Sequence, residues 1–138
     1  MNNYDIIVLG ETMKLNKRNE SIQDYLETIL TLSKNGRVRS IDIAQEMDYS
    51  KPSISIAMKK IKEKGYILID DKGYITLTDE GYEIAKSVYE KHELLAEILI
   101  SLGVEKEIAY QDACRLEHDL SETTFEAIKK YYQKIKKQ

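Results

Sequence analysis

The order in which helical and extended patterns follow one another between residues 20 and 77 most constrains the fold of this chain. Three segments carry apolar residues at helical spacing: 20–34, 40–47 and 52–64. Two short runs rich in β-branched and aromatic residues come next, 66–70 and 74–77, and Asp71-Lys72-Gly73 joins them as a tight turn. Three helices followed by a two-stranded hairpin are the element order of a winged helix-turn-helix.

Residues with turn and capping preferences mark the ends of these segments. Asn35-Gly36 ends the first helix and Gly65 ends the third. Ser40 and Ser50 are the predicted N-caps of the second and third helices, because a serine hydroxyl accepts a hydrogen bond from a free N–H of the first helical turn. Pro52 fits that first turn, where its missing N–H would have no helical partner.

The second half of the chain is predicted to be helical. Thr78 caps a long helix over 79–101, whose buried side is expected to continue to Leu102. Two further helices are predicted, 105–119 and 122–136. Residues 1–18 carry no sustained period. We therefore expect a mainly α protein in three parts: an arm over 1–18, a winged helix-turn-helix over 19–78 and a helical domain over 79–138.

The net charge of −3 conceals two segments of opposite sign. Residues 34–64 hold eight basic and four acidic side chains, whereas residues 79–127 hold four basic and thirteen acidic ones. A basic first half indicates contact with a polyanion, and an acidic second half indicates a different task. The near balance argues against a protein that coats nucleic acid with its whole surface, and the 42% of hydrophobic residues argues against a disordered tail. The alternative is that both runs are solvated faces.

The start of the helix at 52–64 is the predicted DNA-contacting segment. In a helix-turn-helix this helix enters the major groove, with small polar groups at its start and cations along its flank. The alternative is that its serines are caps or surface residues. The predicted double-stranded DNA contacts are Ser50, Lys51, Pro52, Ser53, Ser55, Lys59, Lys60 and Lys72.

The few cysteine and histidine residues suggest a metal site. Cys114, Glu117 and His118 stand at positions i, i+3 and i+4, which is one face of a helix. Thiolate, carboxylate and imidazole are ligands of divalent transition metals. The first helix offers another acidic pair at i, i+3. The alternatives are a small core cysteine, a hydrogen-bonded histidine and solvated carboxylates.

Across residues 19–120 the chain resembles the metal-dependent repressors of the diphtheria-toxin-repressor and manganese-transport-regulator family. The most specific segments are His92-Glu93-Leu94-Leu95 and Cys114-Arg115-Leu116-Glu117-His118. The resemblance implies a winged helix-turn-helix followed by a helical region for dimerisation and metal binding. It also implies a homodimer that binds a palindromic operator when metal is present, in the compact form without an SH3-like domain.

The resemblance places a ligand set on this chain: Asp24, Glu27, His92, Cys114, Glu117 and His118. Carboxylates suit Mn²⁺ and a thiolate suits Fe²⁺, so we expect Mn²⁺ or Fe²⁺, with Zn²⁺ or Co²⁺ binding in vitro. Two positions depart from the family pattern, because Ala96 replaces a frequent acidic ligand and Tyr110 replaces an ancillary histidine. A second metal in the site is therefore in doubt.

Other functions fit the sequence less well. A winged-helix regulator that responds to a small organic ligand, without metal, is the main alternative. An enzyme is not expected, because the HExxH-like run that starts at His92 has Ala96 where the second histidine should stand. A metal chaperone would not need a basic helix-turn-helix. With one cysteine, no signal peptide and no run of 18 apolar residues, we expect a cytoplasmic protein without membrane contact.

Overall fold

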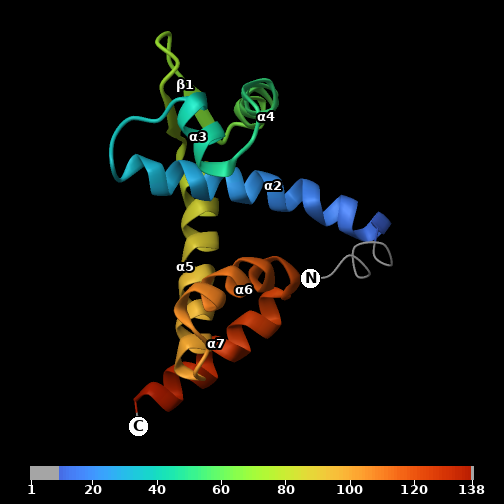
Figure 1. Ribbon diagram of the computed structural model, residues 1–138, viewed down its shortest axis with the longest axis vertical. Helices are drawn as coiled ribbons and strands as arrows, with labels where there is room; N and C mark the ends of the chain where they lie inside the picture. The colour runs from blue at the N-terminus through green and yellow to red at the C-terminus, as the bar shows by residue number, and fades with distance from the viewer. Residues whose placement is uncertain (1–9, 138) are drawn as a thin grey trace. The chain divides into compact units, whose positions relative to one another are not determined.

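The computed structural model describes the backbone of residues 10–137 and the side chains of residues 22–137. Its elements are α2 (Gly10–Ser33), α3 (Ser40–Met47), α4 (Lys51–Glu63), β1 (Ile67–Ile69), β2 (Ile75–Leu77), α5 (Asp79–Ser101), α6 (Lys106–Asp119) and α7 (Glu122–Lys136) (Figure 1). They form two compact units that divide between Lys86 and Ser87, inside α5. Unit 1 ends at Lys86 and unit 2 begins at Ser87.

Unit 1 is a winged helix-turn-helix, as the sequence predicts. In Figure 1, α3, α4 and the hairpin lie on one side of α2. Strands β1 and β2 pair antiparallel, with Ile69 opposite Ile75. The other edge of β2 is taken by Val38, whose carbonyl accepts a hydrogen bond of 2.7 Å from the N–H of Ile75. The loop between α2 and α3 therefore adds one isolated bridge residue, Val38, to the edge of the two-stranded sheet.

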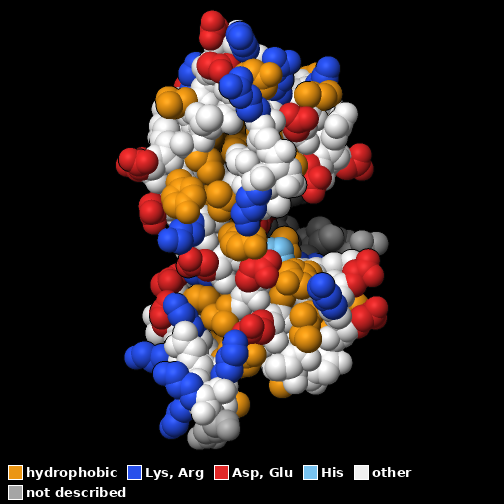
Figure 2. All heavy atoms as spheres, turned by 90° about the vertical axis from the view of Figure 1, so that its left-hand side faces the viewer, with side chains coloured by type: hydrophobic (Ala, Val, Ile, Leu, Met, Phe, Trp, Pro, Cys, Tyr) orange, Lys and Arg blue, Asp and Glu red, His pale blue; other side chains and the backbone are white. Residues whose placement is uncertain are grey.

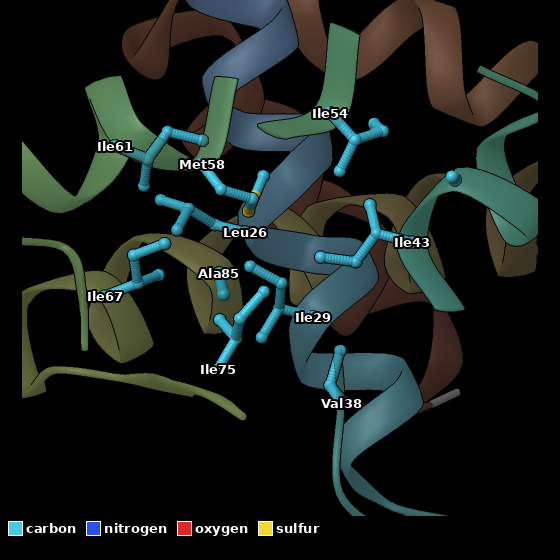
Figure 3. Close-up of a cluster of buried hydrophobic side chains, with 11 residues drawn as sticks. Leu26, Ile29, Val38, Ile43, Ile54, Met58, Ile61, Ile67, Ile75 and Ala85 are labelled. Carbon is cyan, nitrogen blue, oxygen red and sulfur yellow. The ribbon is translucent and has the colours of Figure 1, made fainter. Parts of the chain in front are cut away.

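A single hydrophobic cluster holds unit 1 together (Figure 3). Every helix and strand of the unit contributes to it, and burial of each large aliphatic side chain stabilises the fold by about 1.5–3 kcal/mol. Its labelled members are Leu26, Ile29, Val38, Ile43, Ile54, Met58, Ile61, Ile67, Ile75 and Ala85. Ala85 belongs to the first two turns of α5, which explains why the unit extends past the predicted boundary at 78.

Unit 2 consists of the rest of α5 together with α6 and α7. Its core combines Leu95, Ala96, Ala113 and Phe125. The hydroxyl of Ser121 caps α7 by accepting from the N–H of Thr124 at 3.1 Å. Among the described residues, no helix combines the length and the apolar composition needed to cross a membrane.

Three local expectations differ from the structure. Helix α2 already begins at Gly10, so part of the predicted arm is helical, and residues 1–9 lie outside the described residues. The added stretch has few apolar residues, so a search for periodicity cannot find it. The N-cap of α3 is Arg39 rather than Ser40, and the carboxylate of Asp42 accepts from the Arg39 N–H at 2.8 Å. Helix α5 ends at Ser101 as predicted, but Leu102, which was expected to continue its apolar side, is 74% exposed.

Candidate metal centre and DNA-contacting surface

Helix α4 presents the predicted DNA contacts on its exposed side. Ile54, Met58 and Ile61 face the core, and all eight predicted contacts, including Lys72 in the wing, are exposed. The Ser50 hydroxyl accepts from the N–H of Ser53 at 3.3 Å and donates to the Ser53 hydroxyl at 2.8 Å. This cap fixes the first turn of α4, where small polar groups can approach a base edge closely.

Sequence reasoning missed one residue on this surface. Ile56 is 59% exposed on α4, between the polar start of the helix and its lysines. A large aliphatic side chain that is exposed in the first two turns of a recognition helix can make an apolar contact with the methyl group of a thymine. The sequence could have indicated this exposure, because Ile56 stands only two residues after the buried Ile54. Two residues along a helix turn the side chain away from the buried stripe.

Three of the predicted ligands come together on α6. Each of Cys114, Glu117 and His118 offers a ligand atom, and these atoms lie within 4.8 Å of one another. The side chains of Glu117 and His118 are only 2% and 7% exposed, and Glu117 Oε1 lies 3.5 Å from His118 Nε2. A carboxylate withdrawn from water to this extent needs a positive charge nearby to offset the cost of its burial.

His92 approaches this cluster from α5. Its Nε2 lies 3.1 Å from the carbonyl oxygen of Tyr110, and ligand atoms of His92 and Glu117 lie within 4.8 Å of each other. Because a carbonyl only accepts, Nε2 of the neutral ring carries the proton and Nδ1 presents the lone pair. A hydrogen bond that fixes the tautomer in this way is the usual second interaction of a metal-binding histidine.

The two departures from the family pattern have structural roles of their own. Ala96 is completely buried in the core of unit 2. The hydroxyl of Tyr110 donates to Glu93 Oε2 at 3.0 Å, and this hydrogen bond, followed by the negative charge of Glu93, raises the pKa of Tyr110.

The remaining predicted ligands, Asp24 and Glu27, belong to unit 1. They are half-buried and lie three residues apart on α2, so both carboxylates project from one side of the helix. The donor set as a whole combines oxygen, nitrogen and one sulfur. That chemistry fits a divalent first-row transition metal better than Ca²⁺ or Mg²⁺, which prefer oxygen ligands alone.

Comparison with known families matches both parts of the chain. Residues 18–75 match the family described as iron dependent repressor, N-terminal DNA binding domain, and residues 78–138 match its metal binding and dimerisation domain. These matches define the class as a metal-dependent DNA-binding transcriptional regulator. The chain belongs to the iron-dependent repressor family.

Individual relatives agree with this assignment. The transcriptional regulator MntR of Escherichia coli O6:H1 is 35% identical over 118 residues, which cover 85% of this chain and 76% of the relative. The HTH-type transcriptional regulator MntR of Bacillus subtilis (strain 168) is 30% identical over 109 residues, which cover 78% of this chain and 77% of that protein.

Solved structures agree as well. The manganese regulator SloR superposes with a TM-score of 0.72 at 30% identity, covering 81% of this chain and 53% of that chain. A manganese-dependent transcriptional repressor in complex with manganese gives a TM-score of 0.70 at 30% identity, covering 78% of this chain and 50% of that one. This chain therefore spans about half the length of these two structures.

Proposed function

We propose that this protein is a repressor of metal-uptake genes that binds a palindromic operator as a homodimer when Mn²⁺ or Fe²⁺ is bound. The observation that carries the proposal is the cluster on α6, where a buried carboxylate lies beside an imidazole and a thiol. A chain with a DNA-binding domain has little structural need for such a cluster, whereas a metal-responsive regulator depends on one.

We further propose that six residues hold the metal: Asp24, Glu27, His92, Cys114, Glu117 and His118. Bound metal would supply two positive charges to a site with several carboxylates. Without it, the carboxylates of Asp24, Glu27 and Glu117 would repel one another if brought together. The Tyr110 carbonyl orients the ring of His92 for binding. The oxygen ligands favour Mn²⁺ and Cys114 favours Fe²⁺, with Zn²⁺ and Co²⁺ as in vitro substitutes.

In this proposal the DNA contacts are Ser50, Lys51, Pro52, Ser53, Ser55, Lys59, Lys60 and Lys72. The lysines would contact phosphates, and the start of α4 would contact base edges. Ile56 adds an apolar contact to a thymine methyl group. Two recognition helices in a two-fold dimer must reach half-sites about 34 Å apart, or a multiple of that spacing.

Several large apolar side chains of the matched dimerisation region support association of two chains. They are exposed in the single chain by 36–74%, and they are Ile100, Leu102, Ile108, Leu116, Tyr131 and Ile135. Exposed apolar groups of this size are commonly covered by a partner. A regulator of this kind would work in the cytoplasm, where its DNA is.

The proposal is tested by a DNA-binding titration across a metal panel under anaerobic conditions, which protect the Cys114 thiol from oxidation. A duplex is first selected from random sequences with metal present. Mn²⁺ or Fe²⁺ should tighten its binding to the protein, and His118→Ala and Glu117→Gln should abolish the effect. Glu107→Gln is the matched control, because it removes an exposed carboxylate of the same helix. Equal responses of Glu117→Gln and Glu107→Gln would contradict the proposed site.

A further inference from the structure

Two arginines stack on one tyrosine in the wing of unit 1. The guanidinium carbon of Arg37 lies 4.9 Å from the centre of the Tyr74 ring, and that of Arg39 lies 4.4 Å from it. The backbone explains the arrangement. Val38 is paired with β2 in an extended conformation, and its side chain is 2% exposed in the core. Because successive side chains of a strand alternate, its two neighbours project together on the opposite face.

The backbone of Tyr74 is held in place by the turn of the hairpin. The N–H of Tyr74 donates to Asp70 Oδ1 at 2.8 Å, and its carbonyl accepts from the N–H of Asp70 at 3.0 Å. Ile75, the next residue, is buried and bonded to Val38. The half-buried ring of Tyr74 therefore projects from a fixed backbone position, and the guanidinium groups of Arg37 and Arg39 lie over it.

The acids nearby are hydrogen-bonded to backbone N–H groups. The carboxylate of Asp42 accepts from the backbone N–H of Arg39, and that of Asp70 accepts from the backbone N–H groups of Lys72 and Tyr74. Within residues 22–137, neither Arg37 nor Arg39 forms an ion pair, and both residues are exposed. Figure 2 shows several Lys and Arg side chains, with Asp and Glu side chains among them, at the end of unit 1 that carries the hairpin.

The stacking covers the face of the tyrosine ring. It also holds the two arginines in positions from which they can bind an anion. A guanidinium held over an aromatic ring still has N–H donors that can bind a phosphate, and less side-chain freedom is lost on binding. We propose that Arg37, Tyr74 and Arg39 form a second DNA-contacting site, which binds backbone phosphates of the duplex outside the segment contacted by α4. This inference rests on the proposed function, because it concerns the same DNA complex.

The salt dependence of binding tests the inference. Each phosphate contact contributes about 0.9 to the slope of log K against log salt concentration, so Arg37→Ala/Arg39→Ala should lower the slope by about 1.8. Between 50 and 200 mM salt, the affinity ratio of the original protein to this variant should then fall about tenfold. Lys106→Ala/Lys134→Ala is the matched control, because it removes two exposed cations of unit 2 and should leave the slope unchanged.

A second variant separates the effect of the Tyr74 ring on DNA binding from the effect of the two arginine charges. Tyr74→Leu keeps both arginines but removes the ring, so the slope should be retained while affinity falls roughly two- to tenfold through the greater ordering cost. Circular dichroism melting of each variant without DNA identifies any that fail to fold, and the double arginine variant then carries the test alone.

The outcomes distinguish this inference from the proposed function. If the original protein binds no duplex with metal present, the proposed function fails. If it binds, and Lys60→Ala lowers the slope by about 0.9 while Arg37→Ala/Arg39→Ala does not lower it, only the second site is overturned. A fall in the slope for the double arginine variant that exceeds the fall for the unit 2 control supports the site.

Discussion

Gly81 stands where the wing meets the start of α5, and replacing it with alanine should destabilise unit 1. A Cβ atom at this position would lie 2.0 Å from the carbonyl oxygen of Tyr66 and 2.9 Å from its carbonyl carbon. Both are backbone atoms, so the new methyl group cannot be accommodated by rotating a side chain. The helix must move away by more than 1 Å, since a carbon–oxygen contact is ordinarily about 3.3 Å or longer.

That movement breaks specific hydrogen bonds. The N–H of Thr78 donates to Tyr66 O at 3.0 Å, and the Thr78 hydroxyl donates to Gly65 O at 2.7 Å. Losing them costs about 1 kcal/mol each, and the strain of an overpacked site adds roughly 1–3 kcal/mol. The better helix propensity of alanine returns about 1 kcal/mol. We expect Gly81→Ala to lower the free energy of unfolding by about 2–4 kcal/mol in total.

Urea unfolding followed by far-ultraviolet circular dichroism measures this change, because the chain has no tryptophan for fluorescence. Ser87→Ala is the control, since it changes an exposed residue of the same helix and should alter stability by less than about 0.5 kcal/mol. If Gly81→Ala is as stable as the original protein, the packing of α5 against Tyr66 is not as described.

Three further predictions concern the site and the DNA surface. Ile56→Ala should make binding insensitive to thymine-to-uracil replacement at the contacted base, whereas the original protein should lose about fourfold in affinity for one buried methyl group; equal losses in duplex-binding titrations would contradict this contact. Cys114→Glu should raise the affinity for Mn²⁺ relative to Zn²⁺ in a competition assay, because it exchanges a soft ligand for a hard one; an unchanged ratio would remove Cys114 from the site. The phenol of Tyr110 should deprotonate at a higher pH than an ordinary tyrosine, and Glu93→Gln should lower its pKa toward the ordinary value. A titration followed by NMR of labelled tyrosine measures that shift, and an unshifted Tyr110 would argue against the hydrogen bond.

Elements with a strong apolar stripe were predictable from the sequence. The stripe Ile54, Met58 and Ile61 defines α4, and the cap at Ser50 forms as expected. The beginning of α2 was less predictable, because the residues before 20 carry no apolar period, whereas the predicted end of α5 at residue 101 is confirmed. The wrong cap at Ser40 has a similar origin, since the carboxylate of Asp42 supplies an equivalent interaction from inside the helix.

The candidate metal site was likewise predictable from the sequence only in part. The spacing of Cys114, Glu117 and His118 already placed them on one helical face, because a helix brings i, i+3 and i+4 together. The hydrogen bond between His92 and the Tyr110 carbonyl joins residues 18 apart, and no local pattern encodes it. The arginine stack on Tyr74 likewise depends on the pairing of Val38 with β2, which the sequence does not reveal.

The most direct test of the central claim compares the affinity of the protein for its selected duplex with metal and with chelator, at fixed ionic strength and without oxygen. If metal and DNA binding are coupled, Mn²⁺ or Fe²⁺ should tighten binding by about 5- to 150-fold, the range of typical allosteric coupling. The same dissociation constant in metal and in chelator would contradict a metal-dependent repressor.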